Sequence, residues 1–448
     1  MVNTYSIGRI TDGVKDTKIS FFEYFFVFVM VIYAGRANTF VESVSIKENF
    51  IGVILPILLS VILAFRWKVI FDANFYIVMF CFTLYFIAIS LKDGEMHPTF
   101  FLTYFFKFLN VYIVIKALKF NLFGIYEHVI YYMAITALFL WAIQIVLGGD
   151  TLFNYFNRIP GLDTFSFVTG KGLSTIFYSV QPTSYSILDY KIPRNCGFAQ
   201  EPGSFSVYIC LAIFINLFIT NTGKDSKKLF WVLGIALMST MSTTGYVIFM
   251  VIMVYFILSK NMNKVLLLLP IAIGVLIYMS TLPFMSNKIV ELINETNELD
   301  LLIVNTIGRE ETATPQRFTS FMITYRDFQN NPVLGLGPDN EKSWINKVGA
   351  RISPISGIGN LLAQFGAVGF LFFIISTISS SFYISKYYGY NGRFLLFIII
   401  ILISISYSVI ILPLLMSFWM FKLFSPPILD NEEIYNLSLS SKNSVVNS

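Results

Sequence analysis

Long apolar runs divide the chain into segments of the length that crosses a membrane. A transmembrane helix needs about 20 mostly apolar residues in succession. Such runs lie at residues 19–35, 50–66, 75–91, 100–119, 128–148, 203–220, 229–259, 265–283, 357–385 and 394–424. The run at 229–259 is long enough for a hairpin that turns near Thr243–Gly245, and Pro413 interrupts the run at 394–424. The pattern therefore predicts an all-α, polytopic integral membrane protein with about 11–12 transmembrane helices.

Two long polar segments, residues 149–202 and 284–356, separate these runs, whereas the other connections are short. Basic residues in short loops mark the cytoplasmic side of a membrane protein. Here they fall in alternate loops, namely Arg9, Lys15 and Lys18, Arg66 and Lys68, Lys116 and Lys119, Lys224, Lys227 and Lys228, Lys260 and Lys264, and Lys386 and Arg393. We therefore expect a cytoplasmic N-terminus and two long loops on the outer side.

This topology divides the chain into successive parts. They are N-terminal transmembrane helices 1–5 at residues 1–148, a first large outer loop at 149–202, central transmembrane helices at 203–283, a second large outer loop with an amphipathic helix at 284–356, C-terminal transmembrane helices at 357–424 and a C-terminal tail at 425–448. No cleavage site of small residues follows the first apolar run, so we expect that run to be retained as a helix.

The composition agrees with lipid as the main solvent. The chain is 56% hydrophobic and only 13% charged, whereas soluble domains average about 25% charged residues. The net charge of +5 is expected from basic cytoplasmic loops and does not indicate nucleic-acid binding. Cys81, Cys196 and Cys210 are far apart and form no cluster with histidine. We therefore expect neither a metal site nor a cofactor.

The stretch RNCGFAQEPGS, Arg194–Ser204, places one arginine and one glutamate at the mouth of an apolar run. Proline is favoured in the first turn of a helix, and the residue before it prefers extended geometry. Glu201 is therefore predicted to end the loop, with its carboxylate near the positive end of a helix dipole. Two roles stay open for this residue. It caps the helix and pairs with Arg194 or another basic residue, or it acts as a general base or as the organiser of a neighbouring arginine.

The segment TPQRFTSFMITYRDFQNN predicts an amphipathic helix that starts at Thr314-Pro315. One face of this helix carries Phe318, Phe321, Met322, Tyr325 and Phe328. Such a helix is expected to lie at the outer membrane–water interface. Arg317 stands in the first turn, where a cation is electrostatically unfavourable. It either reaches to lipid phosphates or grips a phosphate-bearing substrate, for which the guanidinium fork suits better than lysine.

A tight turn at Gly335–Pro338 follows this helix, and SGIGNLLAQFGAVGF then opens another membrane helix. A GxG pair on its own is not a nucleotide-binding motif. Gly366 and Gly369 stand at a spacing that favours close helix packing. Asn360 and Gln364 are polar and one turn apart near the membrane edge, which makes them candidates for contacts with a polar ligand.

The order of these motifs resembles that of a known superfamily. Arg194-x6-Glu201-Pro202 enters a helix, the polar-tipped hairpin STMSTTGYVIF follows, and then come Arg317, the turn NNPVLGLG and GNLLAQFGAVGF. This succession is similar to the O-antigen polymerase/ligase superfamily, and more narrowly to the Wzy-type O-antigen polymerases. The matching motifs span residues 194–370, and the likeness in topology extends over the whole chain.

The resemblance implies a membrane glycosyltransferase of the bacterial inner membrane. Such an enzyme joins oligosaccharide repeat units carried on undecaprenyl pyrophosphate at the periplasmic face. The growing chain passes from its lipid pyrophosphate to the non-reducing end of a new lipid-linked unit. The expected partners are this lipid-linked oligosaccharide, membrane lipid, a chain-length regulator and the flippase, and no nucleic acid is expected.

The resemblance also implies roles for individual residues. Arg194 and Glu201 match the motif of the first outer loop, and Arg317 matches the arginine ahead of the glycine turn. These three residues are the expected catalytic set. Arginines would neutralise the charge that develops on the leaving pyrophosphate, and Glu201 would orient or deprotonate the acceptor hydroxyl. The expected substrate-binding residues are Arg309, Arg326, Arg351, Gly335, Gly337 and Asn360.

Two other functions compete with polymerisation. In the related ligases a histidine usually precedes the asparagine that Asn360 matches, but this chain has Gly359 there, which argues against the ligase branch. A lipid-linked oligosaccharide flippase or another transporter would bury charges in the middle of its helices and often shows internal repeats. Here the charges concentrate in the two long loops, which favours chemistry at the membrane surface.

Overall fold

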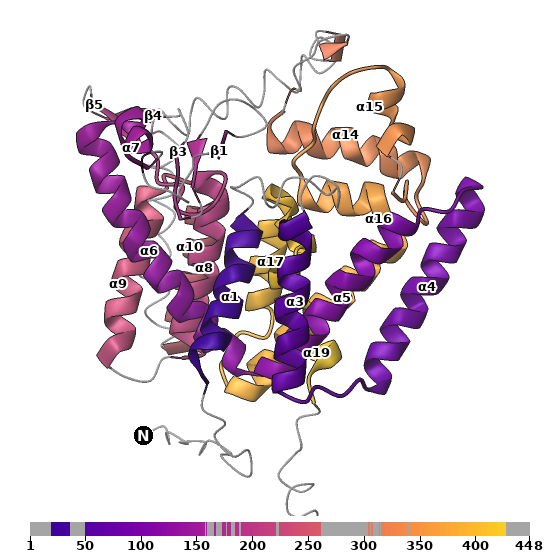
Figure 1. The fold of residues 1–448 in the computed structure, drawn as a ribbon, viewed down its shortest axis with the longest axis horizontal. Helices are drawn as coiled ribbons and strands as arrows, with labels where there is room; N and C mark the ends of the chain where they lie inside the picture. Colours follow the sequence, from indigo (N-terminus) through magenta and orange to yellow (C-terminus); the bar gives the residue numbers. More distant parts are fainter. Residues whose placement is uncertain are drawn as a thin grey trace, which may run out of the picture.

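The apolar runs form a bundle of helices in the computed structural model (Figure 1). The structure describes residues 19–35, 50–260 and 303–426, except for residues 157, 159–164, 167–172, 176, 181–183, 188–189, 221–223, 305, 308–312, 314 and 339. The first helices of the bundle are α1 (Phe21–Gly35), α3 (Phe50–Arg66), α4 (Ala73–Asp93), α5 (Pro98–Leu118), α6 (Asn121–Leu147), α8 (Pro202–Phe218), α9 (Lys224–Ser239) and α10 (Thr243–Lys260). Most of these bounds agree with the predicted runs, although α6 begins seven residues and α9 five residues before the run predicted there.

Within the described residues, four helices are long and apolar enough to cross a membrane: α4, α5, α6 and α16 (Gly357–Tyr388). Five further apolar helices are shorter. The structure therefore confirms the expected all-α, polytopic membrane architecture. The predicted run at 265–283 lies outside the described residues, so the total number of transmembrane helices stays a prediction.

Helix α8 occupies the centre of the bundle. It packs against α6, α9 and α10, and every residue from Pro202 to Ile215 is buried. A helix that is apolar all round is stable only when other helices surround it. The residue that precedes α8, Glu201, therefore stands at the mouth of a helix that is buried along almost its whole length.

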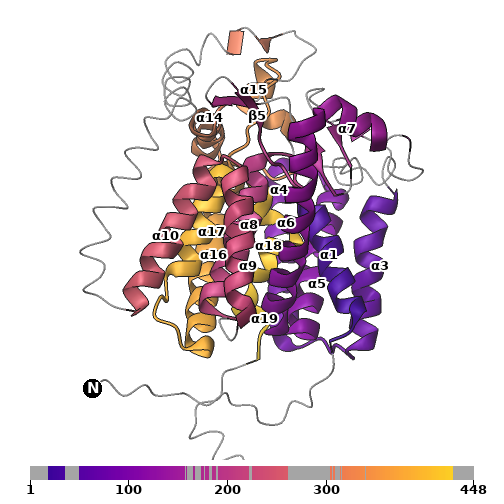
Figure 2. The same ribbon diagram turned by 90° about the vertical axis from the view of Figure 1, so that its left-hand side faces the viewer.

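The described parts of both long polar segments gather at one end of the bundle, which is the upper end in Figures 1 and 2. The first segment contributes α7 (Gly149–Phe156), β1 (Phe165–Ser166), β2 (Leu173–Ser174), β3 (Ser179–Val180), β4 (Ser184–Ile187) and β5 (Tyr190–Pro193). The second contributes α14 (Arg317–Asn330), η1 (Asn340–Lys342) and α15 (Trp344–Lys347). Strands β1–β3 form one small antiparallel sheet, and β4 pairs with β5 in another. These strands are additions to the helical bundle that the sequence did not suggest.

The C-terminal run is broken earlier than predicted. Helix α17 (Leu395–Ser406) ends before Tyr407, and η2 (Ser408–Ile411), α18 (Pro413–Trp419) and α19 (Phe421–Phe424) follow. Pro413 is the first residue of α18, where its missing N–H has no cost. The interruption thus begins at Tyr407, whose backbone is extended.

Helix α16 is broken at Gly366, and the turn after α14 fills the break. Gly366 has φ 62° and ψ −160°, so the helix is two segments. Leu336 N–H donates to Ala363 O at 2.7 Å, and Gly337 N–H donates to Gln364 O at 2.9 Å. In return, the carbonyls of residues 332 and 333 accept from the N–H groups of residues 367 and 368, at 2.8 and 3.2 Å. The turn therefore satisfies the backbone groups that the broken helix leaves unpaired.

The turn lies so close to the backbone of α16 that only glycine fits at the points of contact. Gly335 has φ 73°, and a Cβ built there would lie 2.5 Å from the Gln364 carbonyl. A Cβ at Gly366 would lie 2.4 Å from Val333 O. Gly366 was expected to serve helix packing, but its main effect is to let two backbones meet.

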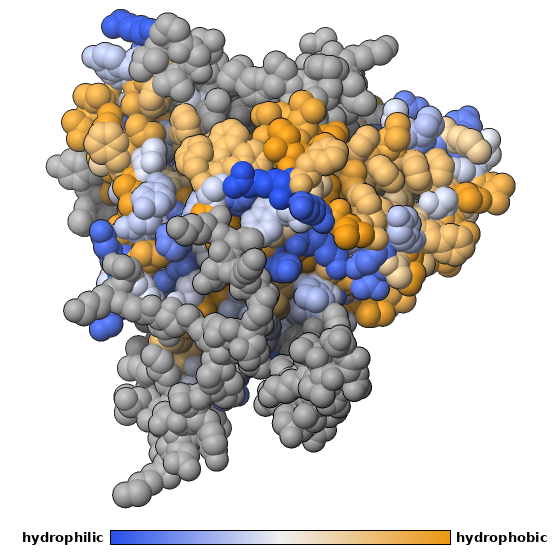
Figure 3. Space-filling model, turned by 60° about the horizontal axis from the view of Figure 1, so that its bottom comes forward, coloured by the Kyte–Doolittle hydropathy of each residue, from blue (hydrophilic) through white to orange (hydrophobic). Residues whose placement is uncertain are grey.

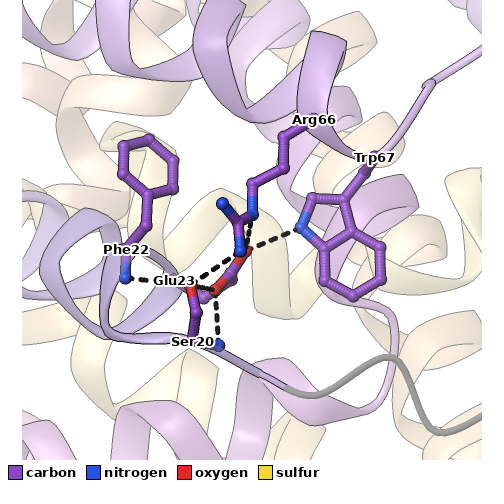
Figure 4. A network of polar contacts seen from close by, with 5 residues as sticks. All are labelled: Ser20, Phe22, Glu23, Arg66 and Trp67. Atoms are coloured by element: carbon purple, nitrogen blue, oxygen red, sulfur yellow. Dashed lines mark hydrogen bonds and ion pairs between the residues drawn. The ribbon is translucent and has the colours of Figure 1, made fainter.

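The lower end of the bundle is joined by a polar network around Glu23 (Figure 4). The Glu23 side chain is fully buried, and its Oε1 accepts from Arg66 Nε at 2.8 Å and from Trp67 Nε1 at 3.0 Å. Ser20 donates its hydroxyl to Glu23 Oε2 at 2.6 Å. These bonds tie the start of α1 to the end of α3. Figure 3 shows hydrophilic residues gathered on this end, beside hydrophobic flanks.

We expect Gly366→Ala to destabilise the protein. The backbone of Gly366, at φ 62° and ψ −160°, is in a region that is essentially restricted to glycine and costs other residues about 1–3 kcal/mol, and the Val333 carbonyl would have to move in addition. Gly234→Ala in α9 is the matched control, because no atom lies within 4 Å of a Cβ built there. The measurement is the membrane level and the thermal unfolding midpoint in detergent. Equal stability of the two variants would contradict this account of the break.

We expect Glu23→Gln to lower the thermal unfolding midpoint, because Arg66 loses its charged partner. Hydrogen bonds to a charged group contribute about 1.5–3 kcal/mol each. Glu95→Gln is the control, since Glu95 is exposed. A midpoint that falls no further for Glu23→Gln than for the control would show that the network does not stabilise the junction of α1 and α3.

Candidate functional site

A pocket at the upper end of the bundle is formed where five chain segments meet. Its lining residues are Gly35, Gln200, Glu201, Ser204, Arg317, Ile355, Tyr407, Ser408 and Val409. They come from the end of α1, the start of α8, the start of α14, the residues before α16 and the interruption after α17. The cavity has a volume of about 70 Å³, well below the roughly 300–1,000 Å³ of typical ligand sites. The pocket therefore suits a compact polar group rather than a whole oligosaccharide.

Glu201 stands where the sequence predicted, immediately before a helix that begins with proline. Its backbone is extended, at φ −142° and ψ 154°, and its side chain makes no capping hydrogen bond. The carboxylate instead accepts a hydrogen bond from Arg317 Nη2 at 2.9 Å. The basic partner of Glu201 is therefore an arginine 116 residues away along the chain.

Arg317 begins α14 and stacks on an aromatic ring. Its guanidinium carbon lies 4.3 Å from the centre of the Tyr407 ring, within the range of a cation–π contact. Burial by itself would lower the pKa of Arg317, but the Glu201 carboxylate and Tyr407 beside it raise that pKa above its ordinary value. The guanidinium is therefore held charged, and in one orientation, between a carboxylate and a ring.

Tyr407 is the site residue that the sequence did not reveal. Its hydroxyl lies against the start of α8, since a Cβ built at Gly203 would be 1.6 Å from it. Its carbonyl lies against the start of α16, since a Cβ at Gly357 would be 2.1 Å away. Both glycines thus make room for this tyrosine. The one local signal was the break in an apolar run, which the sequence attributed to Pro413.

Arg194 lies next to this site but binds backbone. Its Nε donates to Thr240 O at 3.0 Å and its Nη2 to Met241 O at 3.1 Å. The adjacent Asn195 donates its backbone N–H to Ser239 O at 3.0 Å. These carbonyls end α9, where cations are favourable. The arginine therefore holds the turn of the predicted hairpin, which the structure places between α9 and α10.

That turn is in contact with the helix that follows Glu201. Ser206 of α8 donates its hydroxyl to Ser242 Oγ at 3.0 Å, and a Cβ at Gly245 would lie 2.5 Å from Ser206. Arg194 thus stabilises the turn between α9 and α10. That turn contacts the first turns of α8, which position Glu201.

The predicted substrate-binding residues that the structure describes are not among those that line the pocket. Gly335 and Gly337 belong to the turn that fills the break in α16, and the Asn360 side-chain amide donates to Pro354 O at 3.3 Å. Arg326 is exposed and stacks on Trp344 at 4.3 Å. Arg351 is exposed as well, and Arg309 lies outside the described residues.

The polar groups of the pocket are of the kinds that bind anions and hydroxyl groups. It combines one guanidinium, one carboxylate, an amide and the hydroxyl groups of serine and tyrosine. Helix α8 also points its positive N-terminal end at the pocket, and such ends favour anions. Among the described residues, no group of three or more His, Cys, Asp or Glu side chains could hold a metal ion.

Comparison with known proteins bears on the region from α9 to α16. Residues 229–374 match the model of the family described as O-antigen ligase. The match contains Arg317 and the glycine turn, whereas Arg194, Glu201 and Tyr407 lie outside it. No curated protein and no solved structure matches the chain. The expected resemblance to the O-antigen polymerase/ligase superfamily is confirmed over these residues, which are similar to that family of membrane glycosyl-transfer enzymes.

Proposed function

We propose that the protein is an O-antigen polymerase that joins undecaprenyl-pyrophosphate-linked oligosaccharide repeat units. The observation that carries the proposal is the Glu201–Arg317 pair at 2.9 Å in a small pocket at the end of the bundle. A lipid pyrophosphate must meet a sugar at such a boundary between lipid and water. Arginine suits phosphate recognition because its planar fork matches two oxygens at once.

The proposed reaction is a single displacement. The acceptor hydroxyl oxygen attacks the anomeric carbon of the donor sugar, and the bond from this carbon to the pyrophosphate oxygen breaks. The electron pair leaves with the pyrophosphate, and Arg317 stabilises the charge that develops there. A single displacement inverts the configuration of the anomeric carbon.

Glu201 has two tasks in this mechanism. Its hydrogen bond holds Arg317 in position, and its carboxylate is the acceptor for the proton that the sugar hydroxyl loses. A carboxylate has two oxygens and about four acceptor positions, and Arg317 occupies a position on Oε1. Glu201 can therefore orient the arginine and still accept from a hydroxyl.

Position 359 supports polymerase over ligase. A Cβ built at Gly359 would lie 2.1 Å from Thr324 Oγ1 of α14. A histidine, which the ligases carry before the matching asparagine, would force α14 away from α16. The close packing of α14 on Gly359 therefore supports a reaction that does not depend on a histidine at this position.

The positions of the charges support surface chemistry over transport. The four ion pairs found among the described residues are Arg66–Glu23, Lys116–Asp72, Arg317–Glu201 and Lys342–Asp93. All four lie at helix ends, whereas a transporter places such groups in the middle of its helices. We infer that the upper end faces the periplasm and that the N-terminus is cytoplasmic, in the inner membrane. A chain-length regulator and the flippase are the proposed partners.

We expect Arg317→Ala and Glu201→Gln to abolish polymerisation when each variant is expressed in the host strain from which the gene for this protein has been deleted. The readout is the ladder of surface polysaccharide on a gel, with membrane levels measured alongside. Arg317→Lys should lose at least tenfold in long chains, because a point charge replaces the fork. Arg158→Ala is the control, since Arg158 is exposed at the same end of the protein.

The pattern of loss separates the candidate functions. Single repeat units on the lipid core, without a ladder, support polymerase because export and ligation survive. Loss of every repeat unit in the gene deletion would indicate a flippase or a ligase and refute the proposal. If Arg317→Ala and Glu201→Gln are well expressed and give normal ladders, the family resemblance would stand, but this pocket would be excluded as the catalytic site.

We expect Tyr407→Phe to keep most polymerisation and Tyr407→Ala to lose it. Phenylalanine preserves the ring under Arg317, whereas alanine removes the cation–π contact, which contributes about 1–2 kcal/mol when desolvated. Ladder length and membrane level are measured for both variants. If Tyr407→Phe is as inactive as Tyr407→Ala at an equal protein level, the hydroxyl group and not the ring of Tyr407 is needed for polymerisation.

A further inference from the structure

Helix α14 packs with its polar side inward. Thr319, Ser320, Thr324 and Asp327 are each less than 7% exposed, and they face α16 and the segment that holds α15. The Asp327 carboxylate accepts from Ser343 Oγ at 2.6 Å and from the Trp344 N–H at 2.9 Å. Ser320, Thr324 and Asp327 therefore make their hydrogen bonds inside the protein.

The apolar face of α14 is left outside. Phe318 is 48% exposed, Met322 43% and Tyr325 37%. Phe321 stacks on Tyr325 with ring centres 5.7 Å apart, and Tyr325 contacts Phe328 at 5.8 Å. Exposure of such a face to water is unfavourable, because removing apolar surface from water stabilises the protein by roughly 25 cal/mol for each Å². A continuous face of this kind marks a binding surface.

The orientation of the helix indicates what covers this face. In Figures 1 and 2, α14 lies across the upper end of the bundle, at a steep angle to helices such as α8 and α6. It lies beside the first part of α16, which also runs across the bundle (Figure 1). A helix with this orientation lies along a membrane surface if one is present at that depth.

The contacts of the following turn establish the depth. Lys92, in the last turn of α4, donates its ammonium to Gly335 O at 2.5 Å, and a Cβ at Gly337 would be 2.7 Å from Ile89 of the same helix. Helix α4 is a candidate membrane span with Leu91 78% exposed. The turn that ends α14 therefore lies where the lipid-facing surface of α4 ends.

The same turn joins α14 to the lipid-facing surface of α16. Val333 is 61% exposed, and its carbonyl accepts from the N–H of Val368, which is 46% exposed. Beyond Val368 the spanning part of α16 continues with Leu371 and Ile375, 55% and 62% exposed. The exposed apolar surface of a membrane-spanning helix thus reaches the turn from which α14 departs.

We propose that the face formed by Phe318, Phe321, Met322, Tyr325 and Phe328 contacts membrane lipid and lies in the interfacial layer of the bilayer. Aromatic side chains are enriched at that depth. Because Arg317 is the first residue of α14, lipid contact along this helix fixes the arginine at the depth of lipid phosphates. This inference concerns the position of the helix and holds whether the enzyme is a polymerase or a ligase.

The test uses nitroxide labels on the full chain in vesicles of phosphatidylcholine and phosphatidylglycerol. Cys81 is exposed and is first replaced, in Cys81→Ser, whereas Cys196 and Cys210 are buried. Labels are placed by Met322→Cys and, as a second position on the same face, Phe318→Cys. Ile375→Cys on α16 is the lipid reference, and Lys347→Cys on α15 is the aqueous reference, because both side chains are exposed.

The measurement is the collision of each label with oxygen, which concentrates in lipid, and with a water-soluble nickel complex. We expect the Met322 and Phe318 labels to resemble the Ile375 label, with nickel accessibility several-fold below that of the Lys347 label. Nickel accessibility equal to that at Lys347 would refute lipid contact. Low accessibility to both reagents, with dipolar broadening between labelled chains, would show that a second copy covers the face and would also refute the proposal.

Discussion

The backbone of α16 leaves helical geometry at Gly366, and the arrangement of the upper end depends on this break. Buried N–H and carbonyl groups must find partners, and residues 332–337 supply them at distances of 2.7–3.2 Å. Because this segment directly follows α14, the break determines where α14 ends. The first part of α16 then runs across the bundle beneath α14 (Figure 1).

The same arrangement brings two distant charges together at the pocket. Glu201 stands at the positive end of α8, a favourable place for an anion. Arg317 stands at the positive end of α14, an unfavourable place for a cation, and the carboxylate and the Tyr407 ring offset that cost. Charge pairs near a protein boundary interact more strongly than in bulk water. The guanidinium is therefore held in one place before any ligand arrives, as electrostatic catalysis requires.

The glycines of the upper end have a common function, because each lets two segments approach without a side chain between them. Gly203 and Gly357 accommodate Tyr407, Gly359 accommodates Thr324, and Gly335 lies against the backbone of α16. The polar side of α14 faces inward as a consequence of this close packing, and its aromatic side faces outward. In the proposed arrangement the bilayer completes the burial of that aromatic side, so that lipid and protein together position Arg317.

The sequence by itself determined the helices and their ends. Apolar runs predicted the bounds of α1, α3 and α8 to within about two residues, because a membrane helix depends on local hydrophobicity and length. Glu201-Pro202 predicted the start of α8 for an equally local reason. The start of α14 was predicted at Thr314-Pro315, but the structure begins it at Arg317, a small shift of the kind expected at helix ends.

Only the tertiary structure decided which charges meet. Arg194 and Glu201 are seven residues apart, yet Arg194 binds the carbonyls of the hairpin turn and Glu201 binds an arginine 116 residues away. Residue spacing along the chain carries no information about such a pair, since it depends on how α14 lies across the bundle. Tyr407 was missed for the same reason: the break in the apolar run around it does not single out this residue, and its role arises from the three segments that surround it in space.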